Sequence, residues 1–169
     1  MTDVTRTKPL HRLGRALVRD QRGAAAVDLA LLGLPFLLLL LAIMQMGSYY
    51  MTQVALDAGT VKAAESLRAA FGTGVTPVTP SAASLKATIV SGSGNGTSNG
   101  VVSSGLSVEI QPLTNLDSGA VAVTDGLANY GSAWTPLVLR AKYTFNTFMP
   151  GFNSTWSVNS SSIVRRQGQ

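Results

Sequence analysis

Residues that could carry out acid–base, nucleophilic or metal chemistry are few in this chain of 169 residues. It has no cysteine, and its single histidine, His11, lies near the N-terminus among basic residues. Serine and threonine are abundant, but a hydroxyl nucleophile needs an adjacent base, and the sequence supplies no usable one. These observations exclude a thiol nucleophile, a disulfide framework and a cysteine–zinc site.

Three acids, Glu109, Asp117 and Asp125, are scattered through the second half of the chain. General acid–base catalysis by paired carboxylates needs both groups at one site, and this spacing gives no reason to expect that. The glycine-rich stretch 91–100 lacks the Lys-Ser/Thr pair of a phosphate-binding loop and the acids of a calcium loop. We therefore expect a flexible loop there, no metal or cofactor, and no enzyme. A membrane-tethered enzyme remains an unsupported alternative.

The residues that stand out lie at the edge of an apolar run. A basic segment ends in Arg22 and Gly23, and Asp28 is the fifth residue after that glycine. The run 29–46 then reads LALLGLPFLLLLLAIMQM, without a charge and with Gln45 as its one strongly polar residue. At about 1.5 Å per residue, a helix starting near Ala24 crosses a hydrocarbon layer of about 30 Å. In lipid the backbone must satisfy its own hydrogen bonds, which predicts a transmembrane helix.

The stretch RGAAAVDLALLGLPFLLLLLAIMQMG resembles the N-terminal signature of the TadE-like pseudopilins, minor components of tight-adherence (Flp-type IV) pili. In that family a prepilin peptidase cuts after a glycine, and the fifth residue of the mature chain is usually Glu. The resemblance implies cleavage between Gly23 and Ala24, with Asp28 in the position of that Glu. It also implies, as partners, the peptidase, other pilins and pseudopilins, the assembly platform of the inner membrane and the lipid bilayer.

Asp28 needs a partner if it lies within the membrane. An acid at the bilayer centre costs about 2.5–3.5 kcal/mol, and less near the end of a span. In pilin-like assemblies the family's acid is thought to pair with the N-terminal amine of a neighbouring subunit, which here would be the amine of Ala24. That amine is cationic at neutral pH, and low dielectric strengthens the attraction. The alternative is an interfacial Asp28 that reaches the lipid headgroups.

Pro35 and Gly33 lie inside the predicted span. Proline removes a backbone donor and clashes with the carbonyl four residues earlier, so we expect a kink there. Glycine weakens the helix nearby. Two interpretations stay open: a proline tolerated in the membrane, or a stretchable point in a filament core.

Basic residues are concentrated in the first 23 residues, which hold six against two acids, while the rest of the chain holds seven against six. The high isoelectric point thus reflects this leader and not a basic folded surface. The nearly balanced charge of the rest of the chain argues against nucleic acid as a partner. The positive-inside rule predicts a cytoplasmic N-terminus and a periplasmic C-terminal part, in a bacterial inner membrane. An uncleaved signal anchor shares this topology. Secretory cleavage fits poorly, because the apolar run is long and no clean cleavage site follows it.

Beyond the span we expect the helix to continue to about residue 71 and to end near Gly72. Tyr49 and Tyr50 suit the far membrane interface. Apolar residues recur at helical spacing along this continuation and are expected to pack in the core: Val54, Ala58, Val61, Ala64, Leu67 and Phe71.

The C-terminal part is predicted to be rich in β-structure. Ser81 is expected to cap a short helix through Val90. Strands are expected at 106–110, 120–123, 137–145 and 156–164, with a turn at 149–153 between the last two. Alternation along 137–145 predicts that one face of that strand is apolar, with these residues: Leu137, Leu139, Ala141, Tyr143 and Phe145. Trp134 and Trp156 are expected in the core or over the sheet. This final hairpin, with the arginines that follow it, also resembles the C-terminal end of TadE-like proteins.

The predicted fold class is therefore α+β and pilin-like, with a long N-terminal transmembrane helix and a small antiparallel, β-rich periplasmic domain. The predicted divisions are a leader (1–23), a transmembrane helix (24–47), its periplasmic continuation (48–71), a linker (72–105) and the β-rich domain (106–169). The predicted function is that of a minor pseudopilin in pilus assembly and surface adhesion. The alternative is an uncleaved single-pass anchor that carries a small β-rich binding domain.

Overall fold

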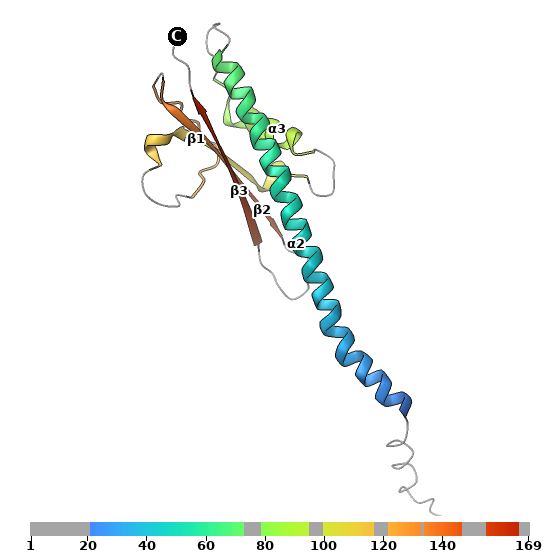
Figure 1. Ribbon diagram of the computed structural model, residues 1–169. Coiled ribbons are helices and arrows are strands. Elements are labelled where there is room, and N and C mark those ends of the chain that lie inside the picture. The colour runs from blue at the N-terminus through green and yellow to red at the C-terminus, as the bar shows by residue number, and fades with distance from the viewer. Residues whose placement is uncertain are drawn as a thin grey trace, which may run out of the picture. The chain divides into compact units, whose positions relative to one another are not determined.

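The computed structural model describes residues 21–72, 79–94, 100–116, 122–132, 134–146 and 155–165. The chain divides into two compact units between Ile43 and Met44. The fold class is α+β, as predicted: a long N-terminal helix precedes a small antiparallel sheet (Figure 1).

Helix α2, Gln21–Gly72, confirms the predicted long helix and its end at Gly72. Pro35 lies inside it, and helical structure continues on both sides of the proline. In the first unit the large apolar side chains of α2 are mostly exposed, from Val27 to Ile43. By its length and composition α2 can cross a membrane.

The sheet consists of β1, Leu106–Pro112, β2, Pro136–Asn146, and β3, Thr155–Arg165, all antiparallel in the order β1-β2-β3. These strands confirm the predictions at 106–110, 137–145 and 156–164. The strand predicted at 120–123 is wrong for its described part, because residues 122–124 have no strand structure. Residues 120 and 121, and the predicted turn at 149–153, lie outside the described residues.

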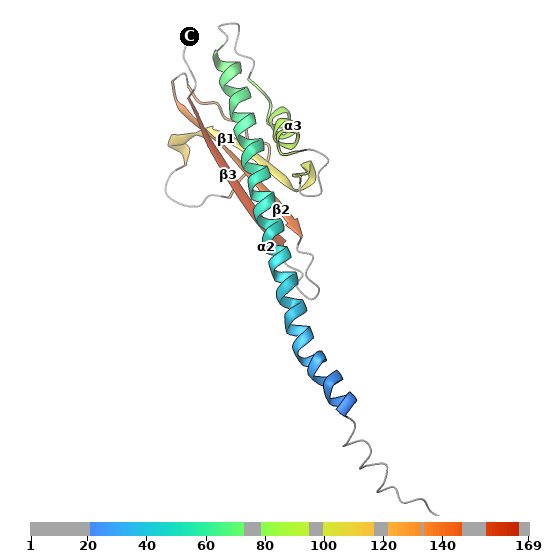
Figure 2. The ribbon, with the colours of Figure 1, turned by 45° about the vertical axis from the view of Figure 1, so that its right-hand side comes forward.

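The core lies between one face of the sheet and the helices. Leu137, Leu139 and Ala141 alternate along β2 and are buried, as the period of two predicted. The second half of α2 and helix α3, Ala82–Gly92, contribute buried residues such as Leu67 and Ile89 to the same cluster. Figure 2 shows α2 and α3 beside the strands. The resulting core belongs entirely to the second unit.

Helix α3 confirms the capping prediction for Ser81. Its side-chain oxygen accepts a hydrogen bond from the backbone N–H of Ser84 at 3.1 Å. This bond satisfies one of the unpaired amides at the start of the helix. Lys86 in the middle of α3 bonds Asp125 at 3.0 Å, which ties the helix to the loop after β1.

Glycines permit the close approach of α2 and α3. A Cβ added to Gly59 would lie 2.4 Å from the backbone oxygen of Ile89, and one added to Gly92 would lie 3.1 Å from the Cα of Gly59. Backbone atoms cannot move aside as a flexible side chain can. A residue with a side chain at position 59 therefore has to separate the helices.

Gly59→Ala should destabilise the second unit, by about 1–3 kcal/mol if overpacking dominates. Ala is a better helix former than Gly by about 1 kcal/mol, so the clash with Ile89 exceeds the net loss of stability by about that amount. Gly47→Ala is the matched control, because a Cβ there meets no described atom within 4 Å. Thermal unfolding of the full chain in detergent, followed by circular dichroism, should show a lower Tm for Gly59→Ala only. An unchanged Tm would contradict this close contact.

The predicted core stripe of α2 is only partly correct. Ala64, Leu67 and Phe71 are buried, but Val54, Ala58 and Val61 are exposed. Steps of three residues fall short of the 3.6-residue turn by about 60° each, so the chosen positions drift around the helix. The buried side instead includes another set of residues, Leu56, Gly59, Thr60 and Ala63.

The two tryptophans differ in burial. Trp156 is half-buried, and its ring lies 5.6 Å from that of Tyr49, so the prediction that it covers the sheet is confirmed. Trp134 is 64% exposed and has a positive φ of 68°, so its prediction as a core or sheet-covering residue is wrong. A tight loop before β2 turns its side chain outward, a backbone conformation that sequence periodicity does not report.

Candidate functional site

Gly23, Ala24 and Asp28 all lie in the first two turns of α2. Gly23 is exposed, and a Cβ added to it would meet no described atom within 4 Å. The peptide bond after Gly23 is thus flanked by a residue without a side chain, between a basic segment and an apolar helix.

Asp28 is exposed on α2, four residues after Ala24. Positions i and i+4 of a helix lie on the same face, one turn apart. An amine created at Ala24 would therefore be on the same side as the Asp28 carboxylate. No hydrogen bond or ion pair of Asp28 is found among the described residues.

Gly33 is half-buried and, like Gly23, has no described atom within 4 Å of an added Cβ. Helical structure runs through both Gly33 and Pro35. The kink at these residues stays a prediction.

An exposed apolar stripe, which the sequence analysis missed, runs along the outer side of α2. It consists of Tyr50, Met51, Val54, Ala58 and Val61. From Met51 onward these residues recur at steps of three and four, opposite the buried side of the helix. The apolar surface of α2 thus continues past the apolar run 29–46 to Val61. A correct helical phase, counted at 3.6 residues per turn, would have separated this stripe from the core.

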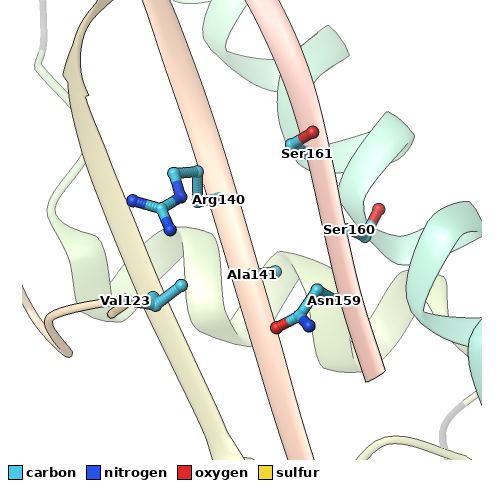
Figure 3. Close-up of a pocket in the computed structure, with 6 residues that line it drawn as sticks. All are labelled: Val123, Arg140, Ala141, Asn159, Ser160 and Ser161. Atoms are coloured by element: carbon cyan, nitrogen blue, oxygen red, sulfur yellow. The ribbon is translucent and has the colours of Figure 1, made fainter. Parts of the chain in front are cut away.

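The outer face of the sheet, away from the helices, carries a shallow polar hollow (Figure 3). Arg140, Asn159 and Ser161 line it, with Val123 at one side. The Arg140 guanidinium lies 3.6 Å from the carboxylate of Glu109, which is buried and accepts a hydrogen bond from the N–H of Thr124 at 3.0 Å. Glu109 therefore offsets the charge of Arg140. Among the described residues that line the hollow, no acid or histidine accompanies the two serines.

The scattered acids serve structural roles in the part of the chain that is described. Asp125 accepts a hydrogen bond from the backbone N–H of Val108 at 3.1 Å. This bond, together with Lys86, lowers the pKa of the Asp125 carboxyl. Asp117 lies outside the described residues. Within the described ranges no group of three His, Cys, Asp or Glu side chains is placed to hold a metal ion.

Comparison with known proteins identifies one family. Residues 23–65 match the family model of the TadE-like proteins. The match begins at Gly23 and ends just beyond Val61, so it includes Asp28, the apolar run and the exposed stripe. It confirms the resemblance predicted from the sequence over this segment. No curated protein and no solved structure matches the chain.

Proposed function

We propose that this chain, whose residues 23–65 match the TadE-like family, is a minor pseudopilin of a tight-adherence pilus. The observation that carries the proposal is the coincidence of that match with Gly23, Asp28 and the charge-free apolar run 29–46 of α2. A structural role in pilus assembly and surface adhesion needs no catalytic group.

In this proposal the basic leader stays in the cytoplasm and α2 crosses the inner membrane. A prepilin peptidase removes residues 1–23, and Ala24 becomes the N-terminus of the mature protein. The second unit then lies in the periplasm and can enter the extracellular pilus. The partners are the peptidase, other pilins and pseudopilins, and the assembly platform.

The exposed stripe of α2 supports this role. An isolated membrane anchor needs an apolar surface only where the helix meets lipid. Here the apolar surface extends through Val54 to Val61, roughly 20 Å beyond Met46 at 1.5 Å per residue. We propose that the helices of neighbouring pilins cover this stripe in the assembled fibre, where apolar burial stabilises the contact.

The proposal is tested by placing a charge on the stripe. Val61→Asp should strongly reduce the amount of this protein that co-purifies with other pilins, because an unpaired carboxylate would be buried at the contact. Val102→Asp is the matched control, since Val61 and Val102 are 52% and 53% exposed. Both variants should fold and insert normally.

The measurement compares sheared pili and solubilised membranes from cells that carry each variant in place of the wild-type gene. Loss of co-purification and of surface pili with Val61→Asp alone supports the pseudopilin. Normal pilus number in cells lacking the protein altogether would reject a role in assembly.

A further inference from the structure

Four aromatic side chains gather where the sheet meets α2. The ring of Tyr49 lies 5.6 Å from Trp156, 5.8 Å from Tyr50 and 6.4 Å from Phe145. Phe145 and Trp156 face each other across β2 and β3, one residue from the end of each strand. We call Tyr49, Tyr50, Phe145 and Trp156 the aromatic cluster. It unites one end of the sheet with one turn of the helix.

The position of the cluster along α2 coincides with the end of the membrane-spanning run. The run ends at Met46, and Tyr49 follows three residues later, about 4.5 Å along the helix axis. All four rings belong to the second unit, as does Met46. The end of the sheet therefore meets the helix within one turn of the end of the apolar run.

No charged residue interrupts this region of the sequence. On α2 the first charge after Asp28 is Asp57, and along the hairpin none occurs between Lys142 and Arg165. Tyr50 and the adjacent Met51 are exposed, while Trp156 and Phe145 are half-buried. Tyrosine and tryptophan favour the membrane–water interface because an apolar ring carries a polar group.

We propose that the aromatic cluster lies in the lipid headgroup layer, so that the end of the sheet at Phe145 and Trp156 rests on the periplasmic surface of the membrane. This inference rests on the membrane span in the proposed function. The partner is the phospholipid bilayer. The contact fixes the depth of α2 and holds the second unit against the membrane before assembly. A single helix would lack that second anchor.

The two natural tryptophans provide the test, because they lie at opposite ends of the sheet. Trp156 belongs to the cluster, whereas Trp134 precedes the first residue of β2, Pro136, which pairs with Arg165 at the far end of β3. Trp134→Phe leaves Trp156 as the one tryptophan, and Trp156→Phe leaves Trp134 as the one tryptophan. The full-length chain is reconstituted into phosphatidylcholine–phosphatidylglycerol vesicles with bromine placed either near the headgroups or near the bilayer centre.

We expect brominated lipid to quench Trp156, more strongly with bromine near the headgroups than near the centre. Trp134 should keep its emission in both kinds of vesicle. Equal quenching of both tryptophans would overturn the inference, because it would place the whole second unit on the membrane. Stronger quenching of Trp156 by bromine near the bilayer centre than near the headgroups would also overturn it, since the cluster would then lie in hydrocarbon.

A third variant separates this inference from the proposed span. Phe36→Trp, in a chain without the two natural tryptophans, places a fluorophore in the apolar run and should be quenched most by bromine near the bilayer centre. If Phe36→Trp is quenched and Trp156 is not, the cluster is a packing contact or a protein contact and the inference fails alone. If neither is quenched, the membrane span fails as well.

Discussion

Replacing Gly23 with Val or Phe is expected to abolish cleavage, so that nearly all of the protein accumulates at full length in the membrane. The resemblance places the cut after this glycine, where the peptidase has to accommodate the residue. A Cβ at position 23 would meet no described atom within 4 Å, so the substitution should not disturb the fold. The loss of cleavage would therefore report recognition by the peptidase and not misfolding.

Mass spectrometry of the membrane-bound protein should find Ala24 as the first residue of the wild-type chain. Gly47→Val is a suitable control, because Gly47 also lies in α2 with no described atom near an added Cβ, but far from the cut. It should be processed normally. A stable chain starting at Met1, in cells that make working pili, would instead favour the uncleaved anchor.

Much of the fold follows from local signals in the sequence. The helix is dictated by an apolar run that has to satisfy its backbone internally, and it ends at Gly72 as expected. Ser81 caps α3 because its hydroxyl oxygen can accept the free N–H of Ser84. The alternation along β2 predicted both the strand and its buried face. Each of these signals acts over a few residues.

The errors arise where distant parts of the chain decide the outcome. Val54 and Val61 are apolar enough for the core, but the sheet packs on the other side of α2. The approach of α3 explains that choice, because glycines at positions 59 and 92 let the helix backbones come so close. Trp134 is turned outward by the backbone of its loop. The sequence pattern reveals neither the approach of α3 to α2 nor the backbone conformation at Trp134.

The candidate site was located by resemblance and not by geometry within the chain. Catalytic sites can be inferred from groups that converge in one fold. Gly23 and Asp28 are instead single residues on an exposed helix, and their proposed chemistry needs a peptidase and a neighbouring subunit. The family match from residue 23 onward is the observation that distinguishes them from an ordinary membrane anchor.

Asp28→Ala is expected to insert and be cleaved normally but to join pili poorly. Removing the acid relieves the cost of placing a charge in the span, so insertion should become easier. In the fibre, however, the amine of Ala24, in an adjacent pilin or in the same helix, would be left unpaired in low dielectric. Removing one member of such a pair costs about 3–5 kcal/mol, which is enough to displace the subunit from the assembly.

Two further variants separate charge from shape. Asp28→Asn keeps the size of the side chain without its charge and should behave like Asp28→Ala. Asp28→Glu keeps the charge on a longer arm, as is usual in the family, and should restore assembly. The readouts are the number of pili per cell and the amount of this protein that co-purifies with other pilins, with cleavage at Ala24 checked for each variant.

Two outcomes of the comparison among the Asp28 variants would contradict the pairing with an amine. If Asp28→Ala assembles as well as the wild type, the carboxylate only reaches the headgroups, and the contact between subunits has to come from the apolar stripe alone. If Asp28→Asn assembles but Asp28→Ala does not, a neutral hydrogen bond suffices and the ion pair is rejected. The pairing proposal survives only if both neutral variants fail while Asp28→Glu succeeds, because only a retained negative charge can offset the buried amine.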